Sequence, residues 1–153
     1  MMRIGVISDT HGLLRAKAVA ALEAVDHILH AGDVGADSIL DTLKKIAPLT
    51  AIRGNVDTRG RCGGLPPTEI VEFGGKAFYL IHSERDLDIK PEAAGVNAVI
   101  YGHSHRPSIE ERQGVLYINP GSAGPRRFTL PITLALIEID DGRLSCVIVE
   151  VTK

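Results

Sequence analysis

Five short motifs hold most of the side chains in this chain that could bind a metal ion or move a proton. Each motif follows a short apolar run with the character of a buried strand. Because ligands of α/β sheets gather beyond the carboxyl ends of the strands, these positions suit a shared site. The motifs are Asp9-Thr10-His11, Gly32-Asp33, Gly54-Asn55-Val56-Asp57, His82 and Gly102-His103-Ser104-His105.

Taken singly, the motifs are weak signals. An Asp-x-His sequence at a strand end is most often a turn or a capping pair, and Gly-Asp is common. His103 and His105 are more informative, because residues two apart in an extended chain project to the same side. His82 alone would more often be a half-buried structural residue than a ligand. Only the complete set, which takes four of the six histidines, indicates a metal site.

The set supplies more donors than one ion uses. A single ion rarely takes seven protein ligands unless it is calcium, which prefers oxygen throughout. Mixed imidazole and carboxylate donors suit manganese, iron, nickel or zinc. Two such ions about 3.5–4 Å apart, sharing one carboxylate, would use the whole set. The candidate donors are Asp9, His11, Asp33, Asn55, His82, His103 and His105.

The charge of such a site favours an anionic substrate. Two divalent ions, partly offset by Asp9, Asp33 and a bridging hydroxide, keep a net positive charge. Metal coordination brings the pKa of water to about 7, so the site also holds its own nucleophile. We therefore expect a small phosphate ester, and not a neutral amide, as the substrate.

Alternating strands and helices are expected in the first third of the chain, which predicts a parallel sheet. A loop rich in Gly and Pro follows, and the second half is predicted to be mostly antiparallel strands with one short helix near 91–94. Because the motifs lie on both sides of this loop and need one another, we expect one domain over residues 1–153. The expected helices span 13–24 and 36–47, the loop spans 59–67, and the expected strands span 3–8, 27–30, 49–52, 68–72, 76–81, 98–101, 108–112, 115–118, 133–139 and 144–151.

Composition excludes several other classes. Lys and Arg number 17 against 19 Asp and Glu, so no basic excess predicts stable nucleic-acid binding or a membrane surface. Cys62 and Cys146 are too few and too far apart for a disulfide framework, which favours a reduced, cytoplasmic protein. The chain has no signal-peptide pattern and no apolar run of about 18 residues. Exposed strand edges are compatible with a homodimer.

The order of the motifs resembles the calcineurin-like metallophosphoesterases. The small size and the later Asn119-Pro120-Gly121-Ser122 are similar to the small bacterial and archaeal phosphodiesterase subfamily, which is similar in fold to the retromer subunit family. The resemblance runs from Ile4 to about Arg127. It implies an α/β fold, a four-layer α/β/β/α sandwich of two facing mixed β-sheets with helices outside.

The resemblance also implies roles for the donors. Asp9, His11, Asp33 and His105 would surround one ion. Asp33 would bridge to a second ion held by Asn55, His82 and His103. Asn55 would also touch a phosphoryl oxygen of the substrate, and the usual metal is manganese.

Two positions depart from the family pattern. The larger family has a His after the Gly-Asn pair that protonates the leaving group, and here that position is Val56. Without that acid, alkoxide departure should be slow and good leaving groups favoured. His82 is followed by Ser83-Glu84, where the subfamily usually has Gly-His, so the lining of the substrate pocket differs.

Other polar residues have two interpretations each. His30 could orient a ligand or be a structural strand-end residue. Asp57 could anchor the Asn55 loop or form a local turn. Arg126 and Arg127 could bind phosphate or lie on the surface. His27 is interpreted as solvated.

The leading hypothesis is a two-metal phosphodiesterase. The alternative is a non-catalytic interaction or scaffold module of the retromer-subunit type, a lineage with a degraded metal site, whereas this chain keeps every ligand. A metallo-β-lactamase-like hydrolase would need His-x-His-x-Asp, and position 107 is Pro. A cyclic nucleotide, a nucleic-acid end, a phospholipid fragment and a small-metabolite diester all remain open as substrates.

Overall fold

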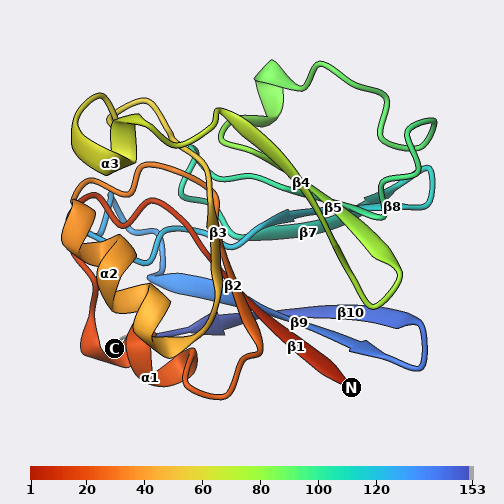
Figure 1. Cartoon of the computed structure of the whole chain (residues 1–153), viewed down its shortest axis with the longest axis horizontal. Coiled ribbons are helices and arrows are strands. Elements are labelled where there is room, and N and C mark those ends of the chain that lie inside the picture. Colours follow the sequence, from red (N-terminus) through yellow and green to blue (C-terminus); the bar gives the residue numbers. More distant parts are fainter. Residues whose placement is uncertain (152–153) are drawn as a thin grey trace.

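Two five-stranded β-sheets pack face to face in the computed structural model, which describes residues 1–151 (Figure 1). The first sheet has the order β10-β9-β1-β2-β3, and the second has the order β4-β5-β6-β8-β7. The strands of the first sheet are β1 (Met2–Ile7), β2 (His27–His30), β3 (Leu49–Ala51), β9 (Thr133–Asp140) and β10 (Arg143–Glu150). Those of the second are β4 (Thr68–Phe73), β5 (Lys76–Ile81), β6 (Ala98–Ile100), β7 (Ser108–Arg112) and β8 (Val115–Asn119).

Both sheets are mixed. In the first sheet, β1, β2 and β3 are parallel, and the β9–β10 hairpin adds to β1 in the antiparallel sense. In the second sheet, β5, β6 and β8 are parallel, and β4 and β7 pair antiparallel at the two edges. The parallel strands of each sheet end on the same side, so the loops that follow them can meet.

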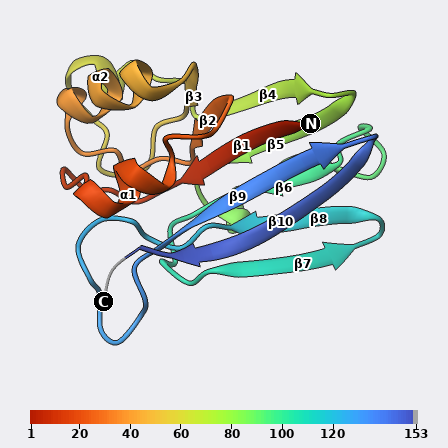
Figure 2. The same ribbon diagram turned by 90° about the horizontal axis from the view of Figure 1, so that it is seen from below.

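The main core lies between the two sheets, which lie one in front of the other when the molecule is seen from below (Figure 2). Alternate residues of each strand point inward, among them Ile4 and Val6 of β1, and Phe78 and Leu80 of β5. All four are fully buried. Burying such a side chain contributes about 1.5–3 kcal/mol, so this layer fixes the register between the sheets.

The outer faces of the two sheets are covered differently. Helices α1 (Ala16–Ala21) and α2 (Asp37–Ile46) cover the first sheet, and α2 buries Ile39, Leu40 and Leu43 on one side. The second sheet is covered by an irregular segment over 84–97 that contains one 3-10 helix, Glu84–Asp86. The expected two-sheet sandwich is confirmed, but this fourth layer has only a single helical turn.

Most predicted strands are confirmed to within one or two residues, and the helices account for the differences. The predicted helix over 13–24 is only six residues long. The loop over 59–67 contains a short helix, α3 (Gly60–Gly63), because the Asp37 carboxylate accepts the backbone N–H groups of Arg61 and Cys62. The helix predicted near 91–94 is wrong: this segment is a hydrogen-bonded turn that ends at Gly95 with φ +77°.

His27 is also not solvated as predicted. Its Nε2 lies 3.0 Å from Thr50 Oγ1, and its ring lies 4.5 Å from that of Phe73, centroid to centroid. Burial lowers its pKa. His27 is therefore a half-buried structural histidine at the start of β2, the opposite end of the strand from the Gly32-Asp33 motif.

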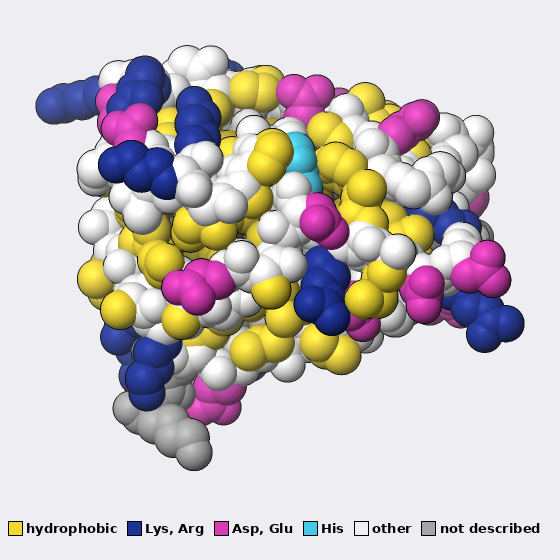
Figure 3. All heavy atoms as spheres, turned by 60° about the horizontal axis from the view of Figure 1, so that its bottom comes forward, with side chains coloured by type: hydrophobic (Ala, Val, Ile, Leu, Met, Phe, Trp, Pro, Cys, Tyr) yellow, Lys and Arg dark blue, Asp and Glu magenta, His cyan; other side chains and the backbone are white. Residues whose placement is uncertain are grey.

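The β9–β10 side of the molecule carries a small hydrophobic pocket. Hydrophobic side chains are spread over this face among charged ones (Figure 3). The pocket has a volume of about 280 Å³ and lies between α1 and the hairpin, against Val25, Leu136 and Cys146. Within residues 1–151, no helix combines the length and the apolar character needed to cross a bilayer.

Candidate metal centre

The loops that follow the parallel strands of both sheets bring the predicted ligands to one place. Asp9 and His11 follow β1, and Asp33 follows β2. His82 follows β5 of the other sheet, and His105 lies in the loop after β6. Segments on both sides of the 59–67 loop thus contribute to one centre.

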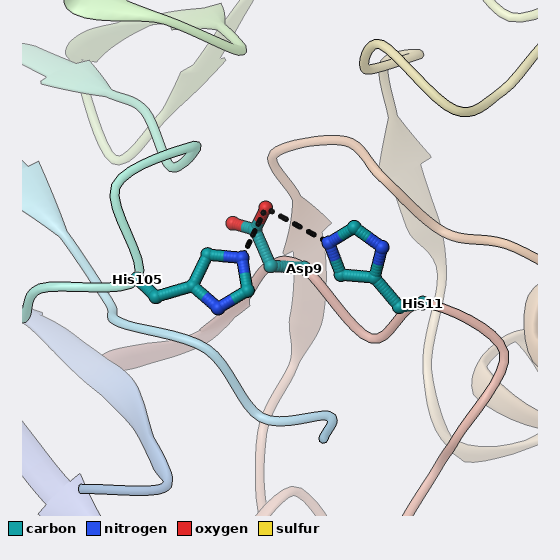
Figure 4. Close-up of side chains that lie close together, drawn as sticks. All are labelled: Asp9, His11 and His105. Carbon is teal, nitrogen blue, oxygen red and sulfur yellow. Dashed lines mark ion pairs between the residues drawn. The ribbon is translucent and has the colours of Figure 1, made fainter. Parts of the chain in front are cut away.

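Asp9 lies at the middle of the first group of side chains (Figure 4). Its Oδ1 is 3.6 Å from His11 Nε2 and 3.4 Å from His105 Nε2. The two imidazole rings lie 5.3 Å apart, centroid to centroid, with the carboxylate between them. One carboxylate and two imidazoles converging in this way could hold one divalent ion.

Asp9, Asp33 and His82 form a second group that shares Asp9 with the first. His82 Nε2 is 3.1 Å from Asp33 Oδ2 and 3.9 Å from Asp9 Oδ1. The same Asp33 oxygen is 3.4 Å from His11 Nε2, so it lies between the histidines of the two groups. The bridging role expected of Asp33 stays a prediction, since the residue common to the two groups is Asp9. The two groups form a candidate dinuclear site.

Several buried atoms in these groups have no hydrogen-bond partner within the described chain. They are Asp9 Oδ1, His11 Nε2, His82 Nε2 and His105 Nδ1. Leaving a buried polar atom unsatisfied costs about 1–3 kcal/mol, so such a cluster needs an explanation. Two of these atoms, His11 Nε2 and His82 Nε2, lie 3.6 and 3.9 Å from a third, Asp9 Oδ1. Carboxylate and imidazole donors fit borderline divalent metals, so the residues present suit the metal that the motifs imply.

The tautomer of His82 is set from outside the cluster. Its Nδ1 is 2.8 Å from the carbonyl oxygen of Ala31, so Nδ1 carries the proton and donates it. In the neutral ring, Nε2 then keeps its lone pair, which is available to a metal ion beside Asp33. Metal-binding histidines are commonly oriented in this way by a backbone carbonyl.

Asn55 and His103 lie at the rim of this cluster. Both side chains are exposed, and neither takes part in the two groups above. The His103 ring meets that of His82 edge-on at 5.3 Å between centroids, and its backbone N–H donates to Asp9 Oδ2 at 3.1 Å. Asn55 borders the same pocket as His82. Their roles as ligands stay predictions.

The electrostatics of the cluster keep its carboxylates ionised. Burial pushes the pKa of Asp9 upward, but the nearby imidazoles of His105 and His11 and the Ser8 hydroxyl outweigh it, and the pKa lies far below its usual value. At Asp33, burial also pushes the pKa upward, but the His82 imidazole and the Val56 N–H outweigh it. The pKa of Asp33 is therefore lowered. The negative charge of the Asp9 carboxylate, 3.6 Å from Nε2, raises the pKa of His11, and the burial of the ring opposes this rise.

Backbone strain is concentrated in these loops. Eight residues other than glycine have a left-handed φ in the described chain, and five of them are predicted ligands. Such a conformation costs a residue with a Cβ about 1 kcal/mol or more, although Asp and His tolerate it better than most. The five are Asp9 (φ 54°), His11 (46°), Asp33 (56°), His103 (73°) and His105 (64°).

Sequence reasoning missed several residues that hold the ligands in place. Ser8 Oγ donates to Asp9 Oδ2 at 2.6 Å, and Ser122 Oγ donates to the Asp9 carbonyl at 2.9 Å. A Cβ at Gly102 would collide with Asp9 Oδ2 and Ser8 Oγ, and one at Gly54 would collide with Asp33. The sequence did hint at these residues, since Ser8 precedes Asp9 and each glycine is the first residue of a motif. Their contacts could not be predicted, because they depend on how the chain folds.

His30 and Asp57 support the loops without reaching the centre. His30 Nδ1 accepts the N–H of Gly32, and Nε2 lies 3.0 Å from Thr10 Oγ1, which itself donates to Val34 O. His30 therefore carries its proton on Nε2. Burial lowers its pKa to about 4, so it is neutral at pH 7.

Asp57 anchors the Asn55 loop, which was one of its two interpretations. Its carboxylate accepts the N–H groups of Val34, Gly35 and Gly54 at 2.8–3.1 Å. It thereby ties the loop after β3 to the loop after β2, which carries Asp33.

The two predicted phosphate-binding arginines differ in position. Arg127 lines a pocket beside His103, and its charge lies close enough to oppose the rise in the pKa of His11 that Asp9 causes. Arg126 instead donates to the carbonyl of Leu130 at 3.0 Å and holds its own loop.

Residues 2–142 match the family model of the calcineurin-like phosphoesterase superfamily domain. The chain belongs to this superfamily. The resemblance that the motifs indicated is thereby confirmed, and the two-sheet sandwich with few helices is the metallophosphoesterase fold.

Relatives within the superfamily include proteins described as phosphoesterases. The chain is 35% identical to a probable metallophosphoesterase of Methanothermobacter thermautotrophicus, over 97% of this chain and 92% of the relative. It is 29% identical to the phosphodiesterase MJ0936 of Methanocaldococcus jannaschii, over 78% of this chain and 83% of that protein. The solved structure of a novel archaeal phosphodiesterase, 26% identical, matches 97% of this chain and all of its own with a TM-score of 0.81.

The fold is also similar to Vps29. Wild-type Vps29 of Entamoeba histolytica in complex with Zn²⁺ matches 99% of this chain and 100% of its own, with a TM-score of 0.76 at 22% identity. At this identity the likeness shows the fold alone. This superfamily member is accordingly a probable metal-dependent phosphoesterase with a candidate dinuclear site.

Proposed function

We propose that the protein is a phosphodiesterase that uses two divalent ions, with manganese as the working metal. The observation that carries the proposal is the pair of groups that share Asp9, with Asp33 Oδ2 between His11 and His82. The names of a 29% identical phosphodiesterase and of an archaeal phosphodiesterase structure support the same substrate class. Ions bound here would supply Lewis acidity and an ionised water as the nucleophile.

The chain itself orients these parts. Asp9, His11 and His105 would hold one ion, and His82, His103 and Asn55 the other, with Asp33 between them. In the reaction, the water oxygen forms a bond to phosphorus while the bond from phosphorus to the leaving oxygen breaks, giving a phosphomonoester and an alcohol or phenol. Asn55, exposed at the rim, can donate its amide N–H to a phosphoryl oxygen as charge grows there.

Val56 sets the choice of leaving group. Its side chain is 49% exposed beside Asn55 and has no proton to give, while its N–H donates to Asp33 Oδ1 at 3.0 Å. The leaving oxygen therefore departs without a general acid from this position. Because general acid catalysis is worth about 10²–10⁴-fold, activated aryl diesters should be cleaved much faster than simple alkyl monoesters.

The alternative is a non-catalytic interaction module of the same fold. A Vps29 structure of this fold is a complex with Zn²⁺, so a chain of this fold can bind a metal ion. Metal binding is not turnover, and it does not by itself establish hydrolysis. Turnover has to decide between the two hypotheses.

The test is hydrolysis of bis(p-nitrophenyl) phosphate with added Mn²⁺, in the wild type and in His82→Gln. We expect turnover that is abolished by a chelator. In the variant we expect a fall of at least about 100-fold, because loss of even an indirect supporting residue costs about 10–100-fold at metal sites. His27→Gln is the matched control, since it alters a half-buried histidine that pairs with Thr50 away from the centre.

Folded, metal-loaded protein that fails to cleave the diester would contradict the proposal and favour the interaction module. Alkyl monoester turnover equal to aryl diester turnover would contradict the role assigned to Val56.

A further inference from the structure

Two separate pockets border the candidate metal centre, one at His103 and the other at His82 and Asn55. The first, here called the arginine pocket, has a volume of about 560 Å³ and is lined by Arg85, Arg106, Arg127, His103 and Phe128. The second, here called the aspartate pocket, has a volume of about 370 Å³ and is lined by Asn55, His82, Asp86, Asp88 and Arg53. Each pocket includes predicted metal ligands. A phosphodiester has two substituents, so one pocket is available for each.

The arginine pocket gathers positive charge that no acidic side chain of the described residues pairs with. Within residues 1–151, the side chains of Arg85, Arg106 and Arg127 make no ion pair. The acidic residue of the lining, Glu84, already pairs with Arg112. The chain as a whole has a formal net charge of −2, so three unpaired arginines in one pocket point to an anionic ligand.

These arginines come from three separate segments. Arg85 lies in the 3-10 helix after β5, Arg106 follows the Gly-His-x-His motif, and Arg127 lies in the loop after β8. Arginines that only keep a surface segment solvated are commonly neighbours in the sequence, whereas each of these three is about twenty residues from the next. Their convergence is a product of the fold, and a guanidinium can bind a phosphate through two N–H groups at once.

Phe128 adds a flat apolar surface to the rim of this pocket. Phe128 is 86% exposed and its φ is +54°. Both the exposure of an apolar ring and the left-handed backbone are unfavourable for a phenylalanine. The loop is closed by a hydrogen bond from Leu130 N–H to Arg127 O and by the contact of Arg126 with Leu130 O. An exposed aromatic ring beside cations is a usual platform for stacking a nucleobase.

The aspartate pocket has the opposite character. Asp86 and Asp88 face it with a single arginine, Arg53, and Asp88 accepts a hydrogen bond from Tyr79 Oη at 2.9 Å. A second anionic group placed there would be repelled. The two substituents of the substrate are therefore distinguished by charge.

We infer that the substrate carries a nucleotide unit with its own additional phosphate in the arginine pocket and an uncharged substituent in the aspartate pocket. The additional phosphate lies against Arg85, Arg106 and Arg127, and the base stacks on Phe128. The assignment rests on the proposed phosphodiesterase function and narrows its substrate class. It disfavours a cyclic mononucleotide, which has no second phosphate to offer.

Three substrates with the same leaving group test this assignment. They are bis(p-nitrophenyl) phosphate, the 5′-p-nitrophenyl ester of thymidine 5′-phosphate, and the same ester with an added 3′-phosphate. In the wild type we expect the 3′-phosphate to raise kcat/KM by at least about tenfold, since hydrogen bonds to charged groups are among the strong ones. In the triple variant Arg85→Gln, Arg106→Gln, Arg127→Gln, the ratio between the two thymidine esters should fall to about one.

The double variant Arg59→Gln, Arg143→Gln is the matched control, because it removes two exposed arginines elsewhere on the surface. It should keep the wild-type ratio. Loss of the ratio in this control as well would assign the effect to general charge and overturn the inference.

Binding gives a second readout that does not need turnover. Thymidine 3′,5′-bisphosphate should bind to metal-free protein, and calorimetry should show weaker binding by at least about tenfold in the triple variant and about tenfold in Phe128→Ala. Wild-type protein that cleaves the bis-aryl diester but shows a 3′-phosphate ratio near one overturns this inference and leaves the phosphodiesterase intact. Wild-type protein that cleaves none of the three substrates contradicts the proposed function itself.

Discussion

Among single residues, Asp9 contributes most to the candidate centre. Its Oδ1 faces the imidazoles of His11, His82 and His105, and its Oδ2 is held by Ser8 and the N–H of His103. The carboxylate is fully buried, so its orientation is fixed by these contacts and not by solvent. Small changes beside it should therefore be felt at the metal.

Gly102→Ala tests this dependence. The added Cβ would meet Asp9 Oδ2 and Ser8 Oγ, and the φ of Gly102 is not left-handed, so the effect is steric. We expect the affinity for Mn²⁺, measured by calorimetry, to fall at least about tenfold, with a loss of about 1–3 kcal/mol in the free energy of unfolding from overpacking.

Gly64→Ala is the matched control for Gly102→Ala. Its Cβ would lie 3.6 Å from Arg61 O, an ordinary contact, and its backbone is already helical. Equal Mn²⁺ affinity in the two alanine variants would show that the close approach of Gly102 does not position Asp9.

The types of the candidate ligand residues could be predicted from the sequence, whereas the residues that support them could not. Asp9, His11, Asp33, His82 and His105 are recognisable because carboxylates and imidazoles recur after apolar runs. Ser8, Gly54 and Gly102 matter through contacts with residues distant in the chain, which spacing does not report. Likewise, the separate orientations of Arg126 and Arg127 depend on how their loop folds.

Among the structural elements, the loops after β1 and β2 act as one unit, because backbone hydrogen bonds from Asp9 and His11 join them and His30 adds a side-chain link. Its ring accepts the Gly32 N–H and donates to Thr10, so it connects the segment that carries Asp9 and His11 to the one that carries Asp33. This arrangement needs the neutral ring, since a protonated Nδ1 could not accept a hydrogen bond.

The pH dependence of stability should report this requirement. The pKa of His30 is about 4 in the folded protein against an ordinary value of 6.5, so below pH 6.5 the unfolded chain binds more protons. The stabilisation is complete above about pH 6.5 and is lost as the pH falls toward 4. Between pH 7.5 and pH 5 this linkage removes about 2 kcal/mol from the free energy of unfolding.

Urea unfolding with a chelator present, in the wild type and in His30→Gln, measures this difference. The variant should lose about 2 kcal/mol less than the wild type over the same pH interval. An identical pH dependence in both proteins would mean that His30 is not held neutral by the fold.

The strands were predictable because their apolar runs and turn residues are local signals. The Asp140-Asp141-Gly142 hairpin is an example, with left-handed φ at Asp141 and Gly142. The helices were less predictable. For example, α3 forms in a stretch rich in Gly because the carboxylate of Asp37, more than twenty residues away, caps its first turn. The fourth layer, expected from the resemblance as helices, is here mostly irregular.

At the scale of the whole molecule, the candidate centre exists only when the two sheets are packed together. Asp9, His11 and Asp33 come from the first sheet, and His82 and His105 from the second. A metal bound between them would stabilise the packed sheets over the unfolded chain. The flanking pockets follow from the same packing, since each is lined by loops of more than one strand.

The number of Mn²⁺ ions bound per chain, measured by equilibrium dialysis, tests the dinuclear centre most directly. The wild type and His27→Gln should bind two ions, and His82→Gln should keep one, because His82 belongs to only one of the two groups that share Asp9. A wild type that binds a single ion, or a His82→Gln variant that still binds two, would contradict the two-metal centre.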